Sequence, residues 1–108
     1  MRLLTEADIA SFLAEKPAAA IHFDAAWNAK YRAVTRNAMA DAEKVLAAYV
    51  NFGEEDCDSE PELAKSIQIL NLPSVAYYRD GKLVGALIGA SQNVQLHLER
   101  VLRGDPIR

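Results

Sequence analysis

Apolar positions along the chain fall into two kinds of run, and the two kinds alternate. Runs with the helical period predict helices over residues 6–15, 29–49, 61–67 and 91–102. Short, nearly continuous or alternating apolar runs predict strands over residues 19–23, 50–56, 75–79 and 83–88. The predicted order is therefore α, β, α, β, α, β, β, α.

Local signals mark several boundaries. Thr5 and Asp8 form a weak capping box at the start of the first helix, and Pro17 ends that helix. Asp80-Gly81 between two apolar runs predicts a hairpin. The last helix ends at Gly104, and residues 1–4 and 104–108 are expected to be loose ends.

The second helix is the longest, and its period predicts which side is buried. The charged residues of its other face, Arg36 among them, are expected to face solvent. The predicted buried stripe consists of Tyr31, Val34, Ala38, Ala42, Val45, Leu46 and Tyr49.

The order of elements predicts an α/β architecture in one domain, residues 1–108. A strand–helix–strand unit implies a parallel pair with a right-handed crossover, the hairpin adds antiparallel strands, and helices cover both faces. The 108 residues are 51% apolar and 25% charged, which suits a domain that folds without metal or disulfide support.

Charge and hydropathy narrow the classes of partner. The net charge is −3 with no evident basic patch, which disfavours nucleic acid and anionic membranes. No apolar run approaches the roughly 20 residues that span a bilayer, and the first residues lack a signal-peptide pattern, so a cytoplasmic protein is expected.

The chain has a single cysteine, Cys57, which cannot form an internal disulfide or run a dithiol cycle within one chain. Its acidic neighbours favour a raised thiol pKa, and an inert structural role is the more common one for such a residue. Together with His22 and His97 it shows no metal-ligand spacing, so neither a metal nor another cofactor is expected. His97 lies on the polar side of the last helix, where no role is expected.

Several segments, in order and at sensible spacings, resemble the thioredoxin family. They are AIHFDAAW at residues 20–27, DSEPELA at 58–64, LPS at 72–74, RDGK at 79–82 and GA at 89–90. The resemblance covers residues 18–102. It implies a thioredoxin-like three-layer α/β/α sandwich with a mixed sheet of four to five strands, and a cis peptide bond before Pro73.

This sequence departs from the family at the positions of the two redox-active cysteines. The resemblance places Asn28 and Tyr31 where the family has its two cysteines, and neither side chain is a nucleophile toward disulfides. We expect Asn28 to cap the second helix and the Tyr31 ring to fill the space of a missing thiol, with hydrogen bonding to a ligand as its alternative. Lys30 and Arg32 are expected to be solvated charges on a basic rim.

A second departure concerns the residue behind the cysteine positions. His22 occupies the place of the family's buried aspartate, and Glu54 the place of that aspartate's lysine partner. The resemblance therefore predicts a buried pair, His22 with Glu54, in which acid and base have changed places.

The resemblance also implies a binding groove that needs no thiol, because the residue before Pro73 offers its backbone to an extended chain. Trp27 is expected either to anchor a partner there or to pack over the start of the second helix. The predicted groove consists of Trp27, Asn28, Ala29, Lys30, Tyr31, Leu72, Pro73, Gly89 and Ala90.

These features predict a redox-inactive adaptor or co-chaperone-like module that binds another protein or an extended peptide, as a monomer or weak homodimer. The absence of the dithiol motif disfavours an enzymatic function. The alternative is a thiol–disulfide oxidoreductase or redox-homeostasis protein acting through Cys57. A third hypothesis is a structural domain with no groove ligand.

Overall fold

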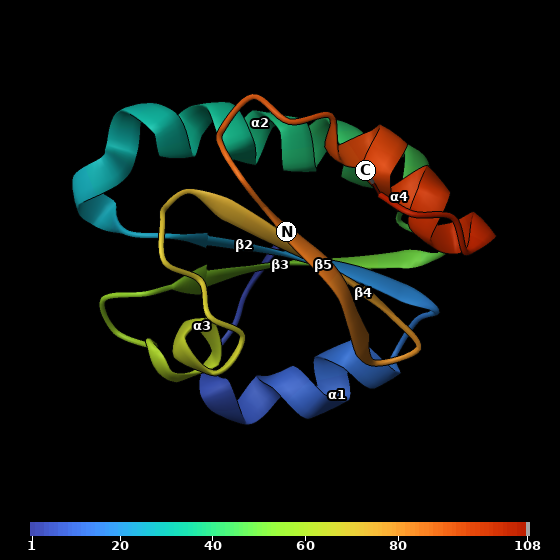
Figure 1. The fold of residues 1–108 in the computed structure, drawn as a ribbon, viewed down its shortest axis with the longest axis horizontal. Coiled ribbons are helices and arrows are strands. Elements are labelled where there is room, and N and C mark those ends of the chain that lie inside the picture. The colour runs from blue at the N-terminus through green and yellow to red at the C-terminus, as the bar shows by residue number, and fades with distance from the viewer. Residues whose placement is uncertain (108) are drawn as a thin grey trace.

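A five-stranded mixed sheet forms the centre of the molecule, and the computed structural model describes residues 1–107 (Figure 1). Its strands lie in the order β1-β3-β2-β4-β5. The strands are β1 (Arg2–Leu3), β2 (Ala18–Asp24), β3 (Val50–Asp56), β4 (Ser74–Arg79) and β5 (Lys82–Ile88). The helices are α1 (Ile9–Ala14), α2 (Ala29–Leu46), α3 (Glu62–Ser66) and α4 (Val94–Arg103), with short 3₁₀ turns η1 (Glu6–Asp8) and η2 (Ala26–Asn28).

Helices cover both faces of this sheet (Figure 1). α2 and α4 lie on one face, over a core that includes Met39, Tyr77 and Leu98. α1 and α3 lie on the other face, over a core that includes Phe12 and Phe23. The predicted three-layer α/β/α fold is confirmed.

β2 is the central strand, and all seven of its residues are buried. It runs parallel to β3 and antiparallel to β4, as the strand–helix–strand unit and the hairpin predicted. Its side chains must fit beneath helices on both faces, which suits its apolar composition. His22 and Asp24 are the polar members of this strand, and both are buried.

The turns follow their local signals. Thr5 N donates to Oδ2 of Asp8 at 2.9 Å at the start of η1. Asp80 and Gly81 both have positive φ, 51° and 79°, as a two-residue hairpin between β4 and β5 requires. Gly104 ends α4 in the left-handed conformation with φ 78°.

α2 buries only part of the predicted stripe. Ala42 and Leu46 are buried as predicted, and Ala38 packs against the same core. Thr35 and Met39, which the prediction left out, are also buried. Tyr31, Val34, Val45 and Tyr49 are exposed, because the rotation of the helix over the sheet is set by packing and not by the helical period alone.

Neither end of the described chain is loose, contrary to expectation. β1 pairs in parallel with β3, and Leu4 is buried in the core beneath α1. Ile107 is buried against Gly85 of β5, whose missing Cβ leaves room for it. Arg108, the last residue of the predicted loose end, lies outside the described residues.

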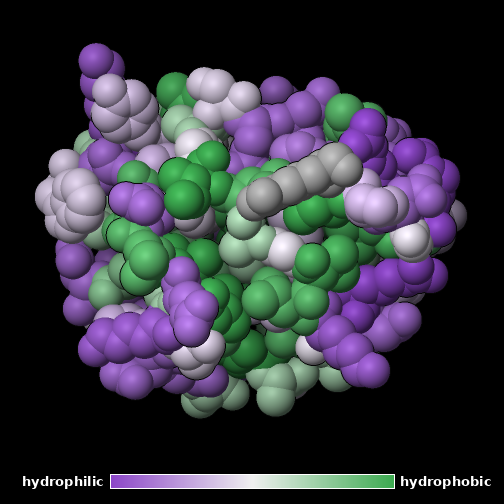
Figure 2. Space-filling model, viewed as in Figure 1, coloured by the Kyte–Doolittle hydropathy of each residue, from purple (hydrophilic) through white to green (hydrophobic). Residues whose placement is uncertain are grey.

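β5 forms one edge of the sheet and carries apolar surface. Leu83, Val84 and Ile88 are exposed there. Apolar side chains gather in the middle of the face that β5 crosses, with polar side chains toward its sides (Figure 2). Within residues 1–107, every helix falls short of the length and apolar character needed to span a bilayer.

Candidate functional site

The site forms where β2 ends and the chain turns into α2. Oδ1 of Asp24, the last residue of β2, accepts hydrogen bonds from the backbone N–H of Ala25 at 2.8 Å and from Nδ2 of Asn28 at 3.1 Å. Asn28 does occupy the N-cap position of α2, but its side chain makes no capping bond. The capping expectation for Asn28 was wrong, because the buried Asp24 carboxylate competes for the amide.

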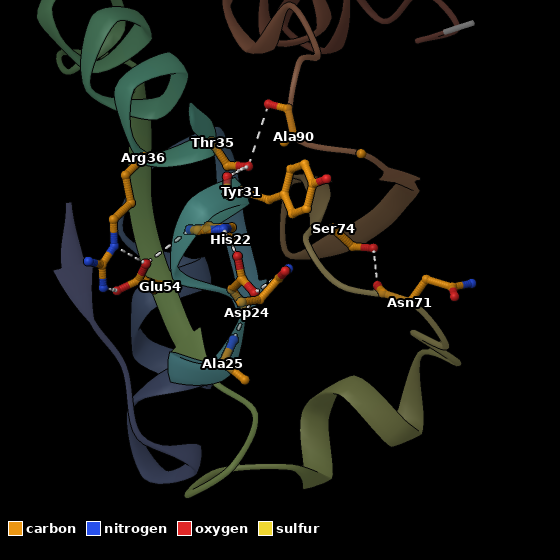
Figure 3. A network of polar contacts seen from close by, with 12 residues as sticks. His22, Asp24, Ala25, Tyr31, Thr35, Arg36, Glu54, Asn71, Ser74 and Ala90 are labelled. Atoms are coloured by element: carbon orange, nitrogen blue, oxygen red, sulfur yellow. Dashed lines mark hydrogen bonds and ion pairs between the residues drawn. The ribbon is translucent and has the colours of Figure 1, made fainter. Parts of the chain in front are cut away.

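His22 lies behind this turn, fully buried between two carboxylates (Figure 3). Its Nδ1 is 3.0 Å from Oε1 of Glu54, and its Nε2 is 3.3 Å from Oδ2 of Asp24. The register explains the first contact, because His22 and Glu54 are direct partners across the parallel β2–β3 pair. Asp24 follows His22 by two residues and therefore shares its face of the strand.

Arg36 of α2 completes the row of charges. Its Nε and Nη2 donate to Oε1 and Oε2 of Glu54 at 2.7 and 2.6 Å, a bidentate pair. Burial opposes ionisation of Glu54, but the hydrogen bonds and positive charges of His22 and Arg36 outweigh it and lower the pKa of Glu54 to about 2. Arg36 was predicted to be merely solvated, and the structure corrects this.

The position of Tyr31 also differs from the expectation. Its side chain is 51% exposed instead of filling a buried space, and its ring points away from His22 (Figure 3). The space behind it is taken by Thr35, whose Oγ1 donates to the backbone oxygen of Tyr31 at 3.3 Å. Lys30 lies over the Tyr31 ring at 5.7 Å, and Arg32 lines a small cavity with Asp24.

A groove lies on the other side of this turn. It has a volume of about 370 Å³, and Trp27 (71% exposed) and Leu70 (87% exposed) both contribute to its walls. The lining residues are Trp27, Cys57, Pro61, Ala64, Lys65, Ile69, Leu70, Asn71 and Leu72. We call this cavity the Trp27 groove.

Only Trp27 and Leu72 of the predicted groove residues line this cavity. Pro73, after a cis peptide bond, is buried, and its backbone oxygen accepts from Gly89 N at 2.9 Å. The backbone oxygen of Ala90 lies 3.5 Å from the Thr35 hydroxyl. These residues tie the β4–β5 end to α2. Asn28, Ala29, Lys30 and Tyr31 lie outside the lining.

Cys57 is half-buried at the wall of the Trp27 groove. Burial, followed by the negative charges of Glu55 and Asp24, raises the pKa of its thiol to about 11. The thiol is therefore protonated at neutral pH, the weakly nucleophilic form. Among residues 1–107, no three histidine, cysteine or acidic side chains are grouped as ligands of a metal would be.

His97 does make a specific contact, contrary to expectation. Its Nδ1 is 3.0 Å from the hydroxyl of the buried Tyr77, and the two rings meet edge to face at 5.3 Å. Burial lowers the pKa of His97. His97 belongs to α4, and Tyr77 belongs to the core beneath α2 and α4, so the contact is part of packing and lies outside the Trp27 groove.

Sequence reasoning missed most of the groove wall, the contact of His22 with Asp24, and the contact of Glu54 with Arg36. The groove wall from α3 onward, including Lys65, Ile69 and Leu70, had a signal in the apolar run before Pro73. Asp24 had a signal too, because a charged residue ends an otherwise apolar strand. No sequence signal pointed to the Arg36–Glu54 pair, because it depends on how α2 packs over the sheet.

Comparisons with known proteins place this chain in a family. The thioredoxin family model matches residues 1–100. Thioredoxin-3, mitochondrial, of Saccharomyces cerevisiae is 36% identical over 50 residues, which are 44% of this chain and only 39% of that relative's length. Its activity therefore does not transfer directly.

Solved structures agree on the fold. The oxidised mitochondrial thioredoxin 3 from Saccharomyces cerevisiae superposes with a TM-score of 0.79 at 22% identity, covering 96% of this chain and 94% of that one. Plasmodium falciparum thioredoxin gives 0.77 at 19% identity, covering 95% and 98%. Human ERp44 gives 0.75 at 21% identity, covering 96% of this chain and 29% of the longer one. The chain belongs to the thioredoxin family.

Proposed function

We propose that this chain is a redox-inactive member of its family that binds an extended segment of another protein in the Trp27 groove, as a cytoplasmic adaptor. The observation that carries the proposal is the pair Trp27 and Leu70, two large apolar side chains left exposed at the walls of one concave surface. Exposed tryptophans beside apolar pockets are typical anchors of protein interfaces.

The shape and lining of the groove favour an extended segment with at least one apolar side chain. Ile69, Leu70 and Leu72 offer aliphatic surface, and Lys65 adds one positive charge at the rim. A volume of about 370 Å³ suits one or two side chains of a peptide, not a whole folded domain.

The chemistry of the site supports binding over catalysis. Asn28 and Tyr31 offer no thiol at the start of α2, where a helix N-terminus would lower a thiol pKa. The thiol of Cys57 has its pKa raised to about 11, the opposite of what exchange with a disulfide requires.

A fluorescein-labelled unfolded protein, reduced and carboxymethylated so that it has no disulfide, is a suitable probe. We expect the wild type to raise its fluorescence anisotropy, and Trp27→Ala and Leu70→Ser to weaken binding by roughly 30-fold, the effect of losing an interface hot spot. Tyr49→Ala removes another exposed aromatic residue, just beyond the far end of α2, and serves as the control. Equal affinity in Trp27→Ala and Tyr49→Ala would contradict the proposal.

The alternative function is thiol–disulfide exchange through Cys57, which shares the groove wall with Trp27. Reduction of insulin by dithiothreitol separates the two functions. We expect no acceleration above the uncatalysed rate. Acceleration that disappears in Cys57→Ser would establish the oxidoreductase and overturn the redox-inactive proposal.

A further inference from the structure

A continuous row of polar contacts joins the middle of α2 to the turn that carries Trp27 (Figure 3). Arg36 binds Glu54, Glu54 meets Nδ1 of His22, and Nε2 of His22 meets Asp24. Asp24 in turn accepts from Ala25 N and from the side chain of Asn28. Trp27 lies between Ala25 and Asn28 in the chain. The row of contacts therefore ends at the turn whose Trp27 side chain lines the groove.

His22, at the middle of this row, contacts both carboxylates through N–H donors only when its ring is protonated. A neutral imidazole has one N–H donor, whereas both ring nitrogens of His22 face carboxylate oxygens, at 3.0 and 3.3 Å. Only the protonated ring donates to both. In a neutral ring, one nitrogen lone pair would face an oxygen lone pair at hydrogen-bond distance.

The two carboxylates do not depend equally on this proton. Glu54 keeps its bidentate pair with Arg36 whatever the state of His22. Asp24 is 2% exposed, and His22 is its only ion-pair partner among residues 1–107. Either neutral tautomer therefore leaves Asp24 as a buried carboxylate without a cation, which is costly unless the carboxylate moves toward water.

Among residues 1–107, no other positively charged side chain lies within ion-pair distance of Asp24. Around His22, β3 contributes Glu54, α2 contributes Arg36, and β4 contributes the apolar Val75 directly across the strand pair. The cavity that adjoins Asp24 and Glu54 is also lined by Arg32, Glu55, Asp56 and Leu3. Arg32 makes no ion pair with Asp24 in this arrangement, and Asp56 adds negative charge to the same region, whereas the buried Glu55, whose pKa is raised to about 8, is protonated at neutral pH.

We propose that His22 and Asp24 are positioning residues, in which protonated His22 holds Asp24 and Asp24 fixes the turn from Ala25 to Asn28 so that Trp27 stands at the groove. Loss of the His22 proton releases that turn. Binding at the groove then weakens as pH rises, and this last step rests on the proposed binding function. The placement of Trp27 itself does not.

Trp27 is the only tryptophan, so its fluorescence reports the turn without any ligand. We expect its emission to change with pH, with the same midpoint as the His22 Cε1–H resonance measured by NMR. His22→Gln, which cannot titrate, should leave the emission flat. His97→Gln removes the other histidine, on α4, and should leave the wild-type response intact.

A second variant keeps the test decisive if His22→Gln does not fold. Asn28→Ala removes one of the two bonds by which Asp24 holds the turn, so His22 should still titrate while the Trp27 response shrinks. The inference is overturned by Trp27 emission that stays flat while the His22 ring changes protonation state, by emission that changes without any change at the His22 ring, or by a response that persists in His22→Gln.

Binding of the labelled unfolded protein separates this inference from the proposed function. We expect affinity to fall by roughly tenfold across the His22 transition in the wild type and to be independent of pH in His22→Gln. Absent binding with an intact Trp27 response overturns the binding function and leaves the coupling standing. Binding that is equally strong on both sides of the transition overturns the coupling to the groove.

Discussion

Replacing Glu55 by glutamine should remove a pH dependence from the stability of this protein. Glu55 of β3 is fully buried, and neither carboxyl oxygen has a hydrogen-bond partner among the described residues. Burial, together with the nearby acids Glu6 and Glu60, raises the pKa of Glu55 to about 8. The folded protein therefore holds this carboxyl protonated at neutral pH, whereas the unfolded chain ionises it.

The sign follows from the number of protons bound. Between the unfolded pKa of 4.5 and the folded pKa of about 8, the folded state holds one more proton at Glu55 than the unfolded state. The free energy of unfolding therefore falls as pH rises, by about 1.4 kcal/mol per pH unit at most. From about pH 5 to about pH 7 the loss from Glu55 alone is on the order of 2–3 kcal/mol.

Urea unfolding, followed by circular dichroism at several pH values, measures this effect. Glu55→Gln keeps the size and polarity of the side chain, so its stability should come within about 1 kcal/mol of the wild type near pH 5 and exceed it by on the order of 3 kcal/mol near pH 7. Glu62→Gln, at an exposed position of α3, is the matched control and should leave the wild-type slope unchanged. Parallel pH profiles for wild type and Glu55→Gln would refute the reasoning.

Three further outcomes follow from single contacts. Gly53→Ala should destabilise the fold by about 1–3 kcal/mol in urea unfolding, since its Cβ would lie 2.5 Å from Leu4 Cδ1 and 2.9 Å from Phe12 Cζ. Glu54→Gln should cost on the order of 3 kcal/mol at neutral pH, and should flatten the loss of stability that the wild type shows as pH falls from 4.5 toward about 2, the folded pKa of Glu54. Cys57 should react slowly with a chromogenic disulfide reagent at about pH 8 in the native protein and rapidly once urea unfolds it, because its folded pKa is about 11.

The predictable part of the fold was the part set by local pattern. β3 was predicted with its observed bounds, although Glu54, Glu55 and Asp56 are poor strand formers. All three are held extended by pairing with β2, and Glu54 also pairs with Leu3 of β1. β1 itself has only two residues and carries no periodicity, so nothing local distinguished it from a frayed end.

The site was predictable where it depended on register and not where it depended on packing. The resemblance placed His22 opposite Glu54, and parallel pairing keeps such partners adjacent. The positions of Tyr31 and Arg36 depend on how α2 rotates about its axis over the sheet, and the helical period alone does not fix that rotation. The groove wall beyond α3 depends on how the loop that carries Leu70 folds back toward Trp27.

The carboxylate of Asp24, at the end of β2, affects how a thiol would behave at position 28. A thiolate at position 28 would lie where the Asn28 amide now meets Asp24, 3.1 Å from a carboxylate oxygen. At that distance a second negative charge is repelled, which raises a thiol pKa and opposes the effect of the helix N-terminus. An amide donor, by contrast, satisfies the carboxylate. The Asn28 amide therefore suits the charged Asp24 carboxylate, and a cysteine introduced at position 28 is expected to have its thiol pKa raised by that carboxylate.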